Sequence, residues 1–148
     1  MAMTMSGEYQ IAAPREVVWA KLNDAETLKA CIPGCESLEK TSDTEFVAVA
    51  VTKIGPVKAR FKGKVRLTDL DPPNGYKISG EGDGGVAGFA KGGASVNLTD
   101  KDGGTLLSYN VEAQIGGKLA QLGQRLVNGA AKKLADDFFV RFAAAVKG

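Results

Sequence analysis

The segment from residue 57 to 67 has the clearest alternation of apolar and polar positions in the chain. Apart from a glycine at position 63, its odd-numbered positions are apolar: Val57, Ala59, Phe61, Val65 and Leu67. The positions between them carry Lys58, Arg60, Lys62, Lys64 and Arg66. Successive side chains of a β-strand point to opposite faces, so this pattern predicts a strand with one covered face and one face in water.

About seven extended segments follow one another, separated by turn signals. The predicted strands are Glu8–Ala12, Ser37–Thr41, Glu45–Ile54, Val57–Leu70, Tyr76–Glu81, Gly93–Asp100 and Thr105–Ile115. Gly55-Pro56 and Asp102-Gly103-Gly104 are short enough to make hairpins between antiparallel neighbours. We therefore expect consecutive strands to pair as an antiparallel meander.

Helical spacing occurs in two places. After the first strand, Pro14 suits the first turn of a short helix, and Asp24 can cap a second short helix that Pro33-Gly34 ends. From Lys118 to about Val146, apolar residues recur at three- and four-residue steps. A helix of roughly 30 residues would be about 45 Å long, enough to lie across the whole sheet. The sequence predicts a single α+β domain over residues 1–148.

The amino-acid composition argues against an enzymatic function. The chain contains no histidine, which removes the usual general base and the commonest zinc ligand. Cys31 and Cys35 are separated by Pro33-Gly34, and two thiols alone leave a metal site short of ligands. We expect no catalytic residues and no metal site, with the cysteines as reduced thiols; a redox pair is the alternative.

The net charge and the hydropathy of the chain restrict the binding partners and the cellular location that we expect. The net charge is +2, too near balance for a general nucleic-acid binder. No apolar run approaches the roughly 20 residues that span a bilayer, and the first ten residues do not resemble a signal peptide. We expect a cytoplasmic protein, with peripheral contact at the inner face of the cell membrane left open.

Several motifs resemble known families. The segment from Ala13 to Asp24 resembles the first helix of the START-like (SRPBCC, Bet v 1-like) superfamily. Four further segments together resemble the family of the carbon monoxide dehydrogenase G subunit, which is encoded beside molybdenum hydroxylases. These are Cys31–Leu38, Lys53–Val57, Gly82–Gly85 with Gly88-Phe89, and Gly116–Gly123. The resemblance covers nearly the whole chain in order.

The resemblance implies a helix-grip fold, in which an antiparallel sheet wraps around a long C-terminal helix and leaves a cavity between them. It also implies a non-catalytic accessory role, linking a carbon monoxide dehydrogenase-like molybdenum hydroxylase to the membrane and its quinone pool. No cofactor is expected other than a bound quinone or another lipophile. Small residues of the C-terminal segment, such as Gly129 and Ala131, would leave room for such a ligand. We predict that Phe61, Phe89, Tyr109, Leu119, Leu122 and Leu126 line the cavity.

The glycine-rich stretch from Gly80 has two interpretations. Gly80–Gly85 contains G-x-G-x-x-G, but the further glycines up to Gly93 disfavour the helix that a dinucleotide site needs. We therefore expect a flexible loop or bulged strand end, and Phe89 within it could gate the cavity mouth.

Two other functions compete with ligand binding. Lys58, Arg60, Lys62, Lys64 and Arg66 are either a solvated outer face or a docking surface for an acidic partner or anionic lipid. In the second case the protein is an assembly or docking subunit without a physiological ligand. A START-like cyclase or hydrolase would need an acid–base pair in the cavity. Tyr109 and Glu112 are the neighbouring candidates, and alternation places them on opposite faces.

Overall fold

Seven antiparallel strands form one sheet in the computed structural model, which describes residues 1–147. The strands are β1 (Ala2–Ile11), β2 (Cys35–Ser42), β3 (Glu45–Ile54), β4 (Val57–Asp71), β5 (Gly75–Asp83), β6 (Phe89–Lys101) and β7 (Gly104–Gly116). Their order is β1-β7-β6-β5-β4-β3-β2. Strands β2 to β7 therefore form the predicted meander, and β1 adds to its end by pairing with β7. The fold class expected from the sequence is confirmed.

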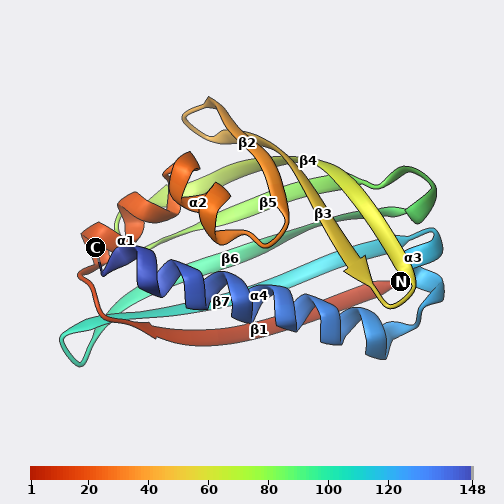
Figure 1. Ribbon diagram of the computed structural model, residues 1–148. Coiled ribbons are helices and arrows are strands. Elements are labelled where there is room, and N and C mark those ends of the chain that lie inside the picture. The colour runs from red at the N-terminus through yellow and green to blue at the C-terminus, as the bar shows by residue number, and fades with distance from the viewer. Residues whose placement is uncertain (148) are drawn as a thin grey trace.

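The sheet curves around a long helix, α4 (Gln124–Val146), which runs along its inner side (Figure 1). On β4, Ala59 and Leu67 are buried on the inner face while the cations between them are exposed, as the alternation predicts. Strand β1 begins at Ala2 and not at Glu8, because Met3 and Met5 continue the inward-facing series in register with β7.

Two short helices, α1 (Arg15–Leu22) and α2 (Ala25–Cys31), follow β1 and lie beside one end of α4 (Figure 1). Pro14 occupies the N-cap position of α1. Asp24 caps α2, because its carboxylate accepts hydrogen bonds from the backbone N–H and the hydroxyl of Thr27. A short 3-10 turn, η1 (Gly85–Ala87), joins β5 to β6.

The expectation of a single C-terminal helix from Lys118 is wrong, because two helices form in this segment. A four-residue helix, α3 (Lys118–Gln121), is separated from α4 by Leu122 and Gly123. Gly123 has φ +94°, which a right-handed helix cannot include. The 23 residues of α4 span about 34 Å, shorter than the expected helix.

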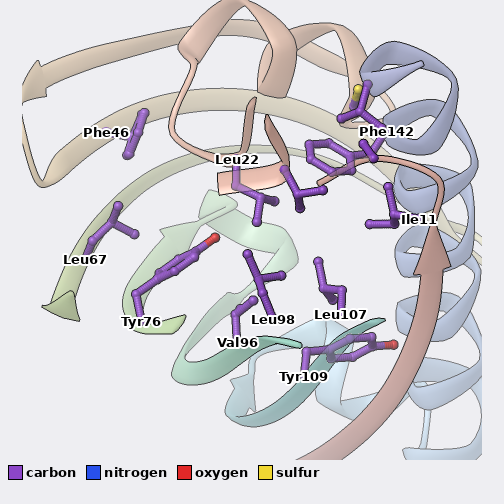
Figure 2. Packing of buried hydrophobic residues seen from close by; sticks show 14 residues of the cluster. Ile11, Leu22, Phe46, Leu67, Tyr76, Val96, Leu98, Leu107, Tyr109 and Phe142 are labelled. Atoms are coloured by element: carbon purple, nitrogen blue, oxygen red, sulfur yellow. The ribbon is translucent and has the colours of Figure 1, made fainter. Parts of the chain in front are cut away.

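Buried side chains form two separate clusters. The larger lies where α1, α2 and the C-terminal half of α4 meet the sheet, and Phe142, Ile11 and Leu107 are almost fully buried in it (Figure 2). The smaller lies toward the α3 end and consists of Met3, Ile115, Leu119 and Val127. Between them the helix and the sheet do not close completely.

Candidate functional site

A cavity of about 570 Å³ lies between the inner face of the sheet and α4. The sheet contributes side chains from β1 and from β3 to β7, among them Met5, Ile78 and Val111. The helix contributes Val127, Ala131, Leu134, Ala135, Phe138 and Phe139, and Ile32-Pro33 after α2 adds a further wall. The volume is within the range of pockets that hold small-molecule ligands.

The lining is almost entirely apolar. Thr52 and Tyr109 are the lining residues with hydroxyl groups, and no lining residue is charged. Several apolar members of the lining, including Ile78, Leu134 and Phe138, are only partly buried by the protein itself. Apolar surface that the protein leaves uncovered favours a lipophilic occupant, because such a molecule removes this surface from water.

Aromatic rings form one side of the cavity. The rings of Tyr9 and Phe139 stack with centroids 4.3 Å apart, and Phe138 meets Phe139 edge to face at 4.9 Å. Tyr109 stacks beyond them, with its centroid 5.7 Å from that of Phe139. Flat, rigid surfaces of this kind are suited to contact with a ring-bearing molecule.

A hydrogen bond holds this aromatic wall to the helix. The Tyr9 hydroxyl donates to a carboxylate oxygen of Asp136 on α4. Partial burial and this bond raise the pKa of Tyr9, and the same bond lowers the pKa of Asp136. At neutral pH Tyr9 therefore keeps its proton as the donor and Asp136 is the charged acceptor.

The sequence model of the family described as the carbon monoxide dehydrogenase G subunit (CoxG) matches residues 7–147. The chain belongs to this family. The resemblance shown by its motifs is thereby confirmed. No curated protein is similar enough to the chain to count as a match.

Several solved structures have the same fold. A conserved protein from Geobacillus kaustophilus is 35% identical, with a TM-score of 0.92 over 98% of this chain and 95% of that one. An aromatase/cyclase, ZhuI from Streptomyces sp. R1128, is 11% identical, with a TM-score of 0.72 over 99% and 94% of the two chains. Ara h 8.0201 is 14% identical, with a TM-score of 0.70 over 99% and 98%. The last two similarities show the Bet v 1-like helix-grip fold.

In this member of the CoxG family, three of the six predicted cavity residues line the cavity: Phe61, Tyr109 and Leu119. Leu122 and Leu126 do not, because Leu122 lies in the break between α3 and α4 and the cavity-lining residues of α4 begin at Val127. Leu122 packs beside the smaller cluster, and Leu126 is 42% exposed next to Gly55.

Phe89 also lies outside the cavity. Its ring rests on Gly116, its partner in β7, so it occupies the outer face of the sheet and is 46% exposed. The next residue, Ala90, faces the cavity in its place. The prediction that Phe89 gates the mouth has no support in this geometry.

The cavity also contains Met3, Met5, Phe138 and Phe139, which the sequence analysis does not assign to it. Alternation continued before Glu8 would reveal the two methionines. The spacing of the C-terminal apolar residues marks Phe138 as inward-facing, but it does not separate residues beside a cavity from residues in a filled core.

The predicted docking residues Lys58, Arg60, Lys62, Lys64 and Arg66 are all exposed on the outer face of β4. Arg60 pairs with Glu36 at 2.8 Å, and Arg66 pairs with Glu45 at 3.2 Å. The three lysines form no ion pair among residues 1–147. Two of the five cations are thus paired with acids of β2 and β3.

The two residues considered as an acid–base pair lie on different faces of the sheet. Tyr109 is buried while Glu112 is exposed on the other face of β7, as the alternation predicts. Both cysteines are free thiols, and burial raises the pKa of each. Across the described part of the chain, no three Cys, Asp or Glu residues gather as a metal site would require.

No helix within residues 1–147 has the length and apolar character to cross a membrane.

Proposed function

We propose that this protein is a non-catalytic accessory subunit that binds a lipophilic, ring-bearing molecule of the quinone class between its sheet and α4. In this role it links a molybdenum hydroxylase of the carbon monoxide dehydrogenase type to the membrane. Family membership supports the partner, and the Bet v 1-like fold supports a ligand cavity. Phe61, Tyr109 and Leu119 are the predicted site residues that would contact the ligand.

The uncharged, apolar lining of the 570 Å³ cavity is the observation that carries this proposal. A ligand with a net charge would lose its hydration without gaining an opposite charge. A quinone ring is flat and uncharged, and its carbonyl oxygens could accept hydrogen bonds from hydroxyl groups such as those of Thr52 and Tyr109. Its tail would cover the aliphatic part of the lining.

Ala131→Phe tests the proposal, because Ala131 lines the cavity from α4 and a larger side chain would fill it. Ala144→Phe is the matched control, since Ala144 is exposed on the same helix. Protein purified from its native host is extracted with organic solvent, and the extract is analysed by mass spectrometry. Binding of a short-chain naphthoquinone is then titrated in solution.

We expect a stoichiometric lipophile in the unmodified protein and in Ala144→Phe, and at least about tenfold weaker naphthoquinone binding in Ala131→Phe. Equal binding by Ala131→Phe would contradict the cavity as the site. An empty protein that ignores added quinones would contradict the ligand-binding role itself.

The second candidate function is an assembly or docking subunit with no physiological ligand. The specific observation in its favour is the exposed row of Lys58, Lys62 and Lys64, which forms no ion pair among residues 1–147. Such a row would attract an acidic surface of the hydroxylase. Reversing the charge of these three lysines would then weaken association with the hydroxylase.

A further inference from the structure

One end of the sheet gathers loops that are far apart in the sequence. The β3–β4 hairpin, the β5–β6 connection with η1, and the link from β7 through α3 to α4 all lie there (Figure 1). We call this the loop end and define it as residues 53–58, 83–91 and 117–126. The β2–β3, β4–β5 and β6–β7 turns lie at the opposite end.

The loop end carries apolar side chains on its outermost parts. Val86 at the tip of η1 is 85% exposed, the highest value among the large hydrophobic residues of the described chain. Phe89, from the same connection, and Leu126, at the start of α4, are 46% and 42% exposed. Burial in the core explains none of these three positions.

Charge at the loop end is nearly all positive. Its exposed cations are Lys53, Lys58, Lys91, Lys118 and Arg125. Its single acid is Asp83, whose carboxylate accepts the backbone N–H of Gly85. None of the five cations takes part in an ion pair among residues 1–147. Glu81 is the cross-strand partner of Lys91 on β5, so Lys53, Lys58, Lys118 and Arg125 carry the excess positive charge near the apolar tips.

The turns at the opposite end have the reverse charge. Its turns carry Asp43, Asp69, Asp71, Asp100 and Asp102, with Lys101 as the cation between the last two. Asp69 pairs with Lys77 and Asp100 with Arg15, so Asp43, Asp71 and Asp102 carry the excess negative charge. An extended negative surface would therefore orient the molecule with the loop end toward it. The small net charge of +2 does not reveal this difference in charge between the two ends.

We propose that the loop end docks on the surface of an anionic phospholipid bilayer. Val86 and Phe89 enter the headgroup region, and the surrounding lysines contact lipid phosphates. Val86 and Phe89 come from the β5–β6 connection and Leu126 from the start of α4, so the exposed apolar groups form two small separate tips among cations. Three such groups are too few for the apolar centre of a protein interface. A bilayer surface accommodates such separate tips, and binding then depends on apolar insertion together with attraction to anionic lipids.

The cavity lies directly behind this end. The docking proposal therefore deepens the proposed function and rests on it. Ile54 of the hairpin and Leu119 of α3 line the cavity. Gly82 and Ala90 line both the cavity and the surface groove that contains Val86. Docking in this orientation places the ligand site next to the membrane, so a lipophile moves between bilayer and cavity over a short path.

Vesicle flotation tests the docking surface. The full chain is mixed with phosphatidylcholine vesicles prepared with or without phosphatidylglycerol, and the vesicle-bound fraction is measured. One variant, Val86→Asp, removes the apolar tip. A second, Lys53→Glu with Lys118→Glu, reverses two cations of the loop end.

Matched controls lie away from this end. Val140→Asp introduces the same change at another valine, which is 71% exposed on α4. Lys29→Glu with Lys101→Glu produces the same change in net charge with residues of α2 and of the opposite end. Circular dichroism checks that every variant is folded.

We expect the unmodified protein and both controls to bind the vesicles that contain phosphatidylglycerol, and to bind them less as salt is raised. Val86→Asp and the loop-end charge variant should each reduce the partition coefficient by at least about tenfold. Absence of vesicle binding by the unmodified protein would overturn the proposal. So would an equal loss in the matched charge control, which would make net charge the cause.

A second readout separates this inference from the proposed function. Naphthoquinone titration without vesicles should give the same affinity for Val86→Asp and the unmodified protein. If no variant binds naphthoquinone but the vesicle results hold, the cavity proposal fails and the docking surface stands. If Val86→Asp impairs capture of the hydroxylase while vesicles bind no variant, the loop end serves a protein partner and the membrane proposal is overturned.

Discussion

The Tyr9 hydroxyl donates a hydrogen bond to Asp136, joining β1 to α4 across 127 positions of the sequence. Lys132 lies 3.5 Å from the other carboxylate oxygen of Asp136. The contact fixes the C-terminal half of the helix against the edge strand of the sheet. It also sets the position of the stacked rings of Tyr9 and Phe139 beside the cavity.

Replacing Tyr9 by Phe should lower the stability of the protein in a pH-dependent manner. The folded-state pKa of Asp136 is below its ordinary value of 3.8, so this group contributes stability above that pH. The contribution is lost as pH falls through the folded pKa. In urea unfolding, Tyr9→Phe should have a lower midpoint at neutral pH, and the difference should shrink in acid below pH 3.8.

Tyr76→Phe provides the control for this titration, because burial alone raises the pKa of Tyr76. Its midpoint relative to the unmodified protein should not change between neutral and acid pH. A loss of the same size at both pH values in Tyr9→Phe would show that the carboxylate does not contribute through this bond.

Two glycines near the start of α4 should respond oppositely to alanine. Gly129 lies inside the helix with open space at its Cβ position, so Gly129→Ala should stabilise the fold by about 0.5–1 kcal/mol. Gly123 has φ +94°, so Gly123→Ala should destabilise it by about 1–3 kcal/mol even though its Cβ position is also open. Urea unfolding of both variants measures the difference. Changes of the same sign would contradict the backbone conformation at Gly123.

Thr105 links the first loop to the sheet. Its fully buried hydroxyl donates a 2.7 Å hydrogen bond to the backbone carbonyl of Ala13. Thr105→Val keeps the shape but leaves that carbonyl without its partner, which should cost about 1–3 kcal/mol in urea unfolding. Thr99→Val, on the outer face of the same hairpin, is exposed and should change stability by less than about 0.5 kcal/mol.

Charge reversal on β4 separates the two candidate functions. If the protein is a docking subunit, Lys58→Glu with Lys62→Glu and Lys64→Glu should weaken its association with the hydroxylase at low salt by at least about tenfold. The expected cause is loss of attraction between the lysine row and an acidic surface. Surface plasmon resonance at several salt concentrations measures the change. Association that survives both the triple reversal and high salt would exclude this surface as the contact.

Much of the fold can be predicted from the sequence because each strand is bounded by residues with clear turn preferences. Gly55-Pro56 and Asp102-Gly103 fix two hairpins, and the predicted bounds of β3, Glu45–Ile54, agree with the structure. The break at Gly123 escapes prediction because the apolar spacing continues across it. Only the backbone angle shows that the helix stops there.

The candidate site is harder to predict. The sequence analysis places Phe89 in a loop at the cavity mouth, because the start of β6 cannot be located within a run of glycines; the strand begins at Phe89 itself. A shift of one residue moves every side chain to the other face. The register that pairs Phe89 with Gly116 resolves this, and it depends on a strand distant in the sequence. Whether an inward-facing side chain meets a neighbour or empty space depends on sheet curvature, which local patterns do not encode.

The division of the core into two clusters gives the molecule unequal resistance to local opening. The C-terminal half of α4 is fixed by Phe142 and Val146 within the larger cluster, whereas its N-terminal half is held mainly by Val127. Amide hydrogens of the first turns of α4 should therefore exchange with solvent well before those near Phe142. A helix that frays at one end while anchored at the other would widen the cavity and leave the rest of the fold in place. Exchange rates along α4 would thus report how often a lipophile can pass.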